Sequence, residues 1–349
     1  MTRTNVRTLV GGDLFVRNDL LLPALRAECG DALSVTEMFF GWPTEPFGPV
    51  AEVKEASGSE EAMIRQVPGI EVIVSEMAPI TQRVIDAADA LKLVVICRGG
   101  PVNVNLEAAT ARGIPVCFSP ARNATATAEY TIGLLLAAMR KLAEGHRDLK
   151  NGAWRGDFYE YVNSGSEIEG KTVGLVGFGA IGSRVARILR AFGAEVLVAD
   201  PYVKPEQVEA VGAKTATLAE MLPQCKAISL HARLTPETHH IIGREQIANL
   251  PKGAVLVNSA RGGLLDYDAM CDALDSGHLG GAAVDVYDPE PPPANSRLFT
   301  TPNLVMSPHI AGCSRETAER AAVLAAAEVG RYLRGEPLLA VANPAALNR

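Results

Sequence analysis

The N-terminal third of the chain alternates short apolar runs with amphipathic stretches. Runs at residues 7–10, 71–74, 93–96 and 115–118 are rich in β-branched residues and have the length of strands. Helical patterns separate them, one with Asn18 as its expected cap and Gly30 beyond its end, and another at residues 106–112. This alternation predicts an α/β fold with a parallel sheet.

The same alternation becomes regular in the second half. Apolar runs at residues 173–176, 195–199, 227–230, 254–258, 282–286 and 304–306 predict six strands, with helical patterns between most of them. Six strands with crossovers is the strand count of a Rossmann fold. Residues 125–149 predict one long helix, and residues 316–334 predict a last helix. The aromatic, polar stretch 151–169 is typical either of a surface loop or of a segment that covers a partner subunit.

Composition narrows the class of protein. The chain has 349 residues, is 48% hydrophobic and 21% charged, and carries a net charge of −7. That balance argues against nucleic acid and anionic membranes as partners. The six cysteines are scattered without a CxxC pair, which favours free thiols in a reducing compartment. No apolar stretch approaches the roughly 18 residues of a membrane span, and we expect a cytoplasmic protein.

The strongest single motif is Gly177-Phe178-Gly179-Ala180-Ile181-Gly182. It follows an expected strand, opens an expected helix, and is followed by Asp200 at the end of the next strand. In such a motif the glycines permit the tight turn, the close approach of a pyrophosphate and the packing of helix on strand. An acidic residue at the position of Asp200 binds the ribose hydroxyls and repels a 2′-phosphate. The motif therefore predicts NAD, in preference to NADP, as the cofactor.

Residues able to do chemistry follow strand after strand in this half. They are His231, the run Ser259-Ala260-Arg261, Asp285 and the run Ser307-Pro308-His309. Ligands of open parallel sheets bind beyond the carboxyl ends of the strands. An arginine can bind a carboxylate through two parallel hydrogen bonds, and a histidine can exchange a proton near neutral pH. Glu290 is the expected partner of His309, because a carboxylate stabilises the protonated ring and fixes which nitrogen faces the substrate.

These residues stand in motifs that resemble the D-isomer-specific 2-hydroxyacid dehydrogenases, a family that includes phosphoglycerate, glycerate and hydroxypyruvate-type enzymes. The resemblance covers nearly the whole chain, through the glycine motif and the runs 106–110, 128–133, 234–238, 258–263, 285–287 and 307–312. It implies a Rossmann cofactor domain, residues 120–309, inserted into a smaller flavodoxin-like α/β substrate domain made of residues 1–119 and 310–349. It also implies a homodimer built through the cofactor domain.

The resemblance implies a catalytic set of Arg261, Glu290 and His309, with His309 as the acid/base in hydride transfer between NAD(H) and a small D-2-hydroxy or 2-keto acid. Asp285 would hold the nicotinamide carboxamide, with Gly312 by the same ring. Substrate contacts are expected from Gly99, Gly100, Arg261 and His309. The expected cofactor-binding residues are Gly177, Gly179, Ala180, Ile181, Gly182, Asp200, His231, Ala232, Thr238, Ser259, Ala260, Asp285 and Gly312.

Two features depart from the family pattern. The substrate loop, residues 98–105, is shorter than usual, and Pro101 removes one backbone donor. Arg233 replaces a proline that the family often has, and would either meet a phosphate or face solvent. The roles of Cys313 and of residues 39–42 stay open, and the adjacent His239 and His240 do not predict a metal site.

Two other functions compete with the dehydrogenase. One is an NAD-sensing regulator similar to the family's corepressors, although this chain keeps all three catalytic residues. The other is a formate- or phosphite-type dehydrogenase, but the formate enzymes have a glutamine at the position of Glu290. The substrate itself stays open among glyoxylate, hydroxypyruvate, phosphohydroxypyruvate and longer sugar acids.

Overall fold

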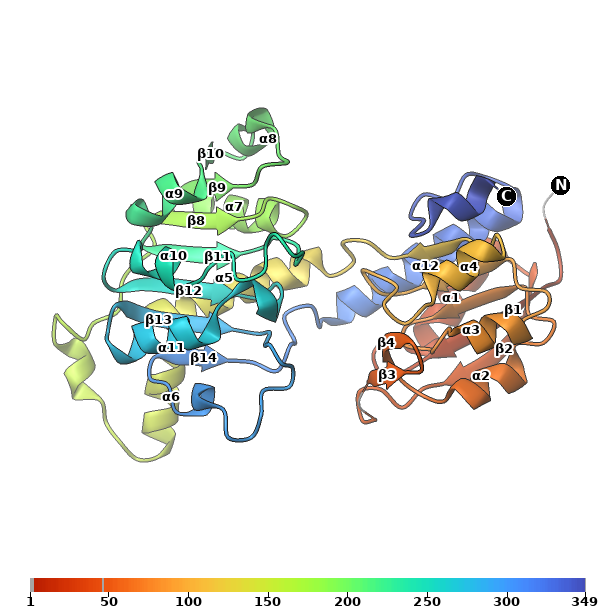
Figure 1. Ribbon diagram of the computed structural model, residues 1–349, viewed down its shortest axis with the longest axis horizontal. Coiled ribbons are helices and arrows are strands. Elements are labelled where there is room, and N and C mark those ends of the chain that lie inside the picture. The colour runs from red at the N-terminus through yellow and green to blue at the C-terminus, as the bar shows by residue number, and fades with distance from the viewer. Residues whose placement is uncertain (1–2, 46, 349) are drawn as a thin grey trace. The chain divides into compact units, whose positions relative to one another are not determined.

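A computed structural model describes residues 3–45 and 47–348 and divides the chain into two compact units (Figure 1). Unit 1 combines Met1–Asn123 with Ser314–Arg349, and unit 2 is Ala124–Cys313. The chain thus enters and leaves unit 2 after residues 123 and 313, where the sequence analysis placed the boundaries after residues 119 and 309. Both crossings lie four residues further along the chain.

Unit 1 is built on a five-stranded parallel sheet. Its strand order is β2-β1-β5-β6-β7, and the strands are β1 (Val6–Gly12), β2 (Leu33–Phe39), β5 (Val72–Ser75), β6 (Leu93–Ile96) and β7 (Val116–Phe118). Numbered within the unit, this is the order 2-1-3-4-5 of flavodoxin-like folds. A small antiparallel hairpin, β3 (Gly48–Val50) and β4 (Val53–Ala56), lies outside the sheet.

Helices cover both faces of this sheet. The core on one face joins α1 (Asn18–Cys29) and α12 (Arg315–Arg334), which come from opposite ends of the chain. The core on the other face joins α2 (Glu60–Gln66), α3 (Gln82–Ala87) and α4 (Leu106–Ala111). Successive residues of a strand point to opposite faces, so Val94 packs in one core and Val95 in the other. Strands buried on both faces read as the continuous apolar runs of the sequence.

Unit 2 is built on a seven-stranded parallel sheet with the order β10-β9-β8-β11-β12-β13-β14. Figure 1 labels the strands in this order from one edge of the sheet to the other. This is the Rossmann order 3-2-1-4-5-6 with one further strand. The strands are β8 (Thr172–Val176), β9 (Glu195–Ala199), β10 (Lys214–Thr215), β11 (Ala227–Leu230), β12 (Ala254–Asn258), β13 (Leu279–Val284) and β14 (Leu304–Met306). The α/β fold expected from the sequence, a Rossmann unit inserted into a flavodoxin-like unit, is confirmed.

The helices of unit 2 form two layers. One core includes α5 (Ala124–Met139), α7 (Gly182–Ala191) and α8 (Pro205–Glu209), and the other includes α9 (Leu218–Met221), α10 (Arg244–Ala248) and α11 (Tyr267–Asp275). Short 3-10 helices lie at Gly156–Tyr159, Leu222–Gln224, Gly262–Leu264 and Arg297–Phe299, with another in unit 1 at Pro344–Asn348. Among the described residues, no helix has the length and apolar character that crossing a bilayer requires.

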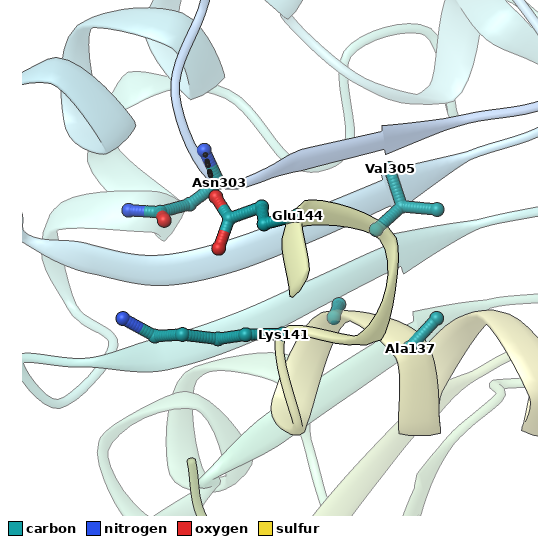
Figure 2. A pocket seen from close by; sticks show the side chains of 6 residues that line it. Ala137, Lys141, Glu144, Asn303 and Val305 are labelled. Atoms are coloured by element: carbon teal, nitrogen blue, oxygen red, sulfur yellow. Dashed lines mark hydrogen bonds between the residues drawn. The ribbon is translucent and has the colours of Figure 1, made fainter. Parts of the chain in front are cut away.

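The prediction of a single long helix at residues 125–149 is wrong. The chain forms α5 and a separate α6 (Leu142–Lys150), because Lys141 adopts the left-handed conformation with φ of 54°. Figure 2 shows how α6 is then held, with Glu144 accepting a 3.0 Å hydrogen bond from the backbone N–H of Asn303. Asn303 precedes β14, so the small pocket drawn there lies at the amino ends of the strands, away from the strand-end residues singled out by the sequence.

Two smaller expectations also change. Asn18 is the first residue of α1 rather than its cap, a position that Arg17 takes. The strand expected at residues 282–286 is β13, which begins at Leu279 and ends at Val284. Asp285 therefore stands directly beyond the strand.

Candidate functional site

Unit 2 brings the predicted strand-end residues to one edge of its sheet. All seven strands are parallel, so the residues that follow β8, β9, β11, β12, β13 and β14 emerge at the same edge. Neighbouring strands are about 4.8 Å apart, and β12, β13 and β14 are consecutive in the sheet. Arg261, Glu290 and His309 are therefore carried by loops from adjacent strands.

The glycine motif forms a turn of the kind that binds a pyrophosphate. Gly177 has a φ of +99°, and a Cβ on Gly182 would lie 2.4 Å from the carbonyl oxygen of Gly177, so both positions require glycine. Gly179, in contrast, faces open space, with no atom within 4 Å of the position of a Cβ. The N–H groups of Gly179, Ala180 and Ile181 donate to none of the residues that the structure describes. Unpaired N–H groups before a helix are suited to phosphate oxygens.

Asp200 lies directly after β9, next to the glycine turn. Its carboxylate accepts hydrogen bonds from the backbone N–H of Phe178 at 2.7 Å and of Tyr202 at 2.9 Å. These bonds fix the carboxylate beside the turn, while the half-buried side chain keeps access to solvent. A carboxylate held there accepts hydrogen bonds from ribose hydroxyls, so the arrangement fits an NAD adenosine.

His309 and Glu290 form a hydrogen-bonded pair. Nδ1 of His309 lies 2.6 Å from Oε1 of Glu290, and the two side chains are 44% and 32% exposed. The other carboxylate oxygen of Glu290 accepts the backbone N–H of Tyr287 at 3.4 Å. With Nδ1 occupied, Nε2 is the nitrogen of His309 left to exchange a proton with a ligand.

Arg261 is exposed at the end of β12. Its Nη1 donates to the carbonyl of Ala260 at 2.7 Å, and its own carbonyl accepts a 3.0 Å hydrogen bond from the side chain of Asn258. The backbone of the loop is thus fixed by the buried Asn258, while most guanidinium N–H groups have no partner among the described residues. This leaves Arg261 able to bind a carboxylate in two-pronged geometry.

The carboxylate of Asp285 is fully buried, with 0% of the residue exposed. One oxygen accepts from the hydroxyl of Ser307 at 2.6 Å and from the N–H of Ile310 at 2.9 Å, and the other accepts from the N–H of Ala311 at 2.7 Å. These donors lie on both sides of His309, whose φ of +55° is left-handed. Asp285 therefore holds the turn that carries His309, and its contact with a nicotinamide carboxamide stays a prediction. Gly312 follows this turn.

The remaining expected cofactor residues line the same edge. Burial lowers the pKa of His231 to about 4, so this ring is neutral near pH 7. Its Nε2 lies 3.0 Å from the hydroxyl of Ser229. Ser259 is hydrogen-bonded to Thr131 of α5 at 2.6 Å, and the hydroxyl of Thr238 donates to the carbonyl of Arg233 at 2.6 Å. Ala232 and Ala260 follow β11 and β12, where Ala232 packs against the glycine turn.

In unit 1 the expected substrate loop follows β6. No atom lies within 4 Å of the Cβ position of Gly99 or Gly100, and their N–H groups have no acceptor in the part of the chain that the structure describes. Arg98 is not free to bind a ligand there, because it forms a 2.5 Å ion pair with Glu55 and lies over the ring of Phe47. The loop thus offers backbone donors to an anion.

A buried charged cluster at the same edge of unit 1 was not predicted from the sequence. Arg122 forms two hydrogen bonds to Glu76, at 2.8 and 2.6 Å, and Asp13 lies nearby after β1. Burial, and to a smaller extent the charge of Glu76, raises the pKa of Asp13 to about 7. The sequence offered one indication of this cluster, which is that Asp13 and Glu76 each directly follow a strand.

Other candidates are not brought together into a site. His239 and His240 stack on each other with ring centroids 4.0 Å apart. Among the described residues, no group of three or more histidine, cysteine, aspartate or glutamate side chains could hold a metal ion. Arg233 and Cys313 are both exposed. In residues 39–42, Phe40 is buried and Trp42 packs edge-on against Phe15, at a centroid distance of 5.9 Å.

Comparison with known proteins agrees with this geometry. Residues 132–311 match the NAD binding domain of the D-isomer specific 2-hydroxyacid dehydrogenases. D-3-phosphoglycerate dehydrogenase of Methanocaldococcus jannaschii is 37% identical over 290 residues, covering 82% of this chain and 54% of the relative. Glyoxylate reductase of Korarchaeum cryptofilum is 35% identical over 283 residues, covering 81% of this chain and 85% of the relative.

A solved structure is similar along nearly the whole chain. The crystal structure of the TT0316 protein from Thermus thermophilus covers 97% of this chain and 100% of its own, with a TM-score of 0.78 and 33% identity. The chain spans about half the length of the phosphoglycerate dehydrogenase relatives that it matches. The matches show that the chain belongs to the D-isomer specific 2-hydroxyacid dehydrogenase family and carries its NAD binding domain.

Proposed function

We propose that the protein is an NAD-dependent dehydrogenase that interconverts a small 2-keto acid and the corresponding D-2-hydroxy acid. The observation that carries the proposal is the His309–Glu290 hydrogen bond of 2.6 Å at the sheet edge that also carries the glycine turn. A ketone that accepts a hydride becomes an alkoxide and needs a proton, and this pair can supply it. Names among the relatives, D-3-phosphoglycerate dehydrogenase and glyoxylate reductase, support this class of reaction.

The residues present fit a bound dinucleotide. The open space at Gly179 would receive the pyrophosphate, together with the N–H groups around it, which have no acceptor in the described parts of the chain. Asp200 would receive the adenine ribose. NAD, when bound, supplies the hydride acceptor for oxidation and, as NADH, the hydride donor for reduction. Because a carboxylate at position 200 repels a 2′-phosphate, NADH is the expected form.

The protein's own residues supply the remaining chemistry. Arg261 binds the substrate carboxylate and polarises the carbonyl, since its guanidinium is exposed and mostly without partners among the described residues. His309 donates a proton from Nε2 to the carbonyl oxygen in reduction and removes it from the hydroxyl in oxidation. Glu290 orients the ring and stabilises its protonated form. The substrate contacts expected at Gly99 and Gly100 stay a prediction.

The proposal includes a homodimer formed through unit 2. Large apolar side chains are exposed along α6 and the following loop, with Trp154 at 82%, Tyr159 at 93% and Tyr161 at 95%. Exposed apolar groups concentrated on one segment are typical of an interaction surface. Sedimentation velocity should give a dimer mass, and a monomer at micromolar concentration would contradict this part of the proposal. The cytoplasmic location stays a prediction.

The activity itself is tested by NADH and NADPH oxidation against short 2-keto acids, with and without a phosphate group. Turnover of at least one acid with NADH, and a much weaker response to NADPH, is the expected result. Tight NADH binding without turnover of any acid would contradict the dehydrogenase and favour the NAD-sensing regulator.

A further inference from the structure

Tyr287 contacts all three loops that carry the proposed catalytic residues. Its backbone N–H donates to Glu290, and its hydroxyl donates to the carbonyl of Ser307 at 2.8 Å, two residues before His309. Its carbonyl oxygen lies so close to Gly262 that a Cβ there would be 1.9 Å away. Gly262 directly follows Arg261, so this contact joins the loop after β12 to the loop after β13.

The hydroxyl of Tyr287 is fixed as a donor. The residue is 8% exposed, and burial raises the pKa of its phenol to about 12, so it stays protonated at neutral pH. Ser307 is held from two directions, since Tyr287 donates to its carbonyl while its own hydroxyl donates to the buried Asp285 at 2.6 Å. The turn from Ser307 to His309 is therefore anchored to the residues that directly follow β13.

We infer that Tyr287 is a positioning residue, which sets the His309–Glu290 pair by fixing Ser307 on one side and Glu290 on the other. Tyr287 touches no reacting atom and acts only through these neighbours. The inference rests on the proposed function for its effect on catalysis, but its effect on the His309–Glu290 pair is independent of any substrate.

Tyr287→Phe tests the inference, because it removes the hydroxyl and keeps the ring. Tyr267→Phe is the matched control. The hydroxyl of Tyr267 donates to the carbonyl of Val286, so it holds the same segment without touching Ser307 or Glu290. Its ring lies 6.4 Å from that of Tyr287. Ser307→Ala removes the other anchor of the turn and should act in the same direction as Tyr287→Phe.

The first measurement is NMR of the isotope-labelled protein without cofactor, in which His309→Ala assigns the imidazole signals of His309. In Tyr287→Phe the Nδ1–H proton signal of His309 should shift and exchange faster with water, because the hydrogen bond to Glu290 is loosened. Neither change should appear in Tyr267→Phe. An unchanged signal in Tyr287→Phe, or an equal change in both variants, would overturn the inference.

The second measurement is steady-state kinetics with NADH. Tyr287→Phe should lower kcat by about tenfold, the size expected for the loss of one hydrogen bond, here the one to the carbonyl of Ser307, with less than a twofold change in KM for NADH. Equal losses of kcat in Tyr287→Phe and Tyr267→Phe would show a general loosening and contradict a positioning role. If no keto acid is turned over, the proposed function fails, while the NMR result still decides the inference.

Discussion

Oε1 of Glu290 lies 2.6 Å from Nδ1 of His309, on the opposite side of the ring from the nitrogen available to a substrate. The carboxylate therefore does two things, since it fixes the orientation of the imidazole and stabilises its positive charge. Glu290→Gln separates them, because an amide can keep a hydrogen bond but carries no charge.

We expect Glu290→Gln to slow keto-acid reduction roughly tenfold or more, because the amide keeps a hydrogen bond to Nδ1 but cannot balance the positive charge of the protonated ring. Rates measured under saturating NADH provide the check. A variant that keeps the wild-type rate would mean that the charge of Glu290 does not act on His309.

Arg261 should account for most of the binding of the substrate carboxylate. Arg261→Ala removes a charged pair of hydrogen bonds, worth about 3 kcal/mol, so kcat/KM should fall about 100-fold or more while the affinity for NADH stays within twofold. Arg233→Ala is the control, since Arg233 is also exposed at a neighbouring strand end. With unphosphorylated acids it should keep wild-type kinetics, and equal losses in the two variants would argue against a special role for Arg261.

Substitutions at two glycines of the glycine turn should affect cofactor binding and folding separately. Gly179→Val should leave the melting temperature nearly unchanged, because no atom of the described residues lies within 4 Å of that Cβ position, but should weaken NADH binding by about 100-fold by filling the space for the pyrophosphate. Gly182→Val should destabilise the protein, because its Cβ would lie 2.4 Å from a backbone oxygen. Calorimetry and NADH fluorescence measure the two effects. Unchanged NADH affinity in Gly179→Val would show that the pyrophosphate binds elsewhere.

Asp13 should make the stability of the protein depend on pH. Its pKa is about 7 in the folded protein and near the ordinary value of 3.8 once unfolded, so the folded state holds the extra proton between those values. Stability contributed by this group is present at low pH and is lost as pH rises from about 4 to 7. Asparagine at position 13 does not titrate, so Asp13→Asn does not lose this stability. Its free energy of unfolding, relative to that of wild type, should be roughly 2 kcal/mol higher at pH 8 than at pH 5.

Urea denaturation at both pH values tests this, with Asp19→Asn as the control. Asp19 is 58% exposed and paired with Arg17, so its variant should show no such trend. If the difference between wild type and Asp13→Asn is the same at pH 5 and pH 8, the carboxyl of Asp13 does not titrate as a buried group.

The parts of the fold that the sequence predicts well are those with strong local signals. Strands such as β6 and β12 are buried on both faces and read as unbroken apolar runs, and the glycine motif marks its own strand and helix. Because parallel strands end at one edge, the positions of Arg261, Asp285 and His309 along the chain were enough to predict that they meet there.

Other features were not predicted because they depend on contacts between distant parts of the chain, or on backbone conformations that the residue type does not indicate. The break between α5 and α6 falls at Lys141, a residue type that rarely takes a positive φ and gives no warning of a helix end. The edge strand β2 was missed because most of its residues are exposed and show no clear alternation. The cluster of Asp13, Glu76 and Arg122 joins three separate parts of the chain. The role of Asp285 as an anchor likewise appears only when its donors are seen.

The pH dependence of keto-acid reduction, compared between wild type and His309→Ala, decides whether His309 is the proton donor. The wild-type rate of reduction should fall as pH rises, the rate of oxidation should show the opposite trend, and both trends should disappear in a variant slowed by about 100-fold or more. A variant with the wild-type rate and the wild-type pH profile would show that His309 is not the group that exchanges the proton.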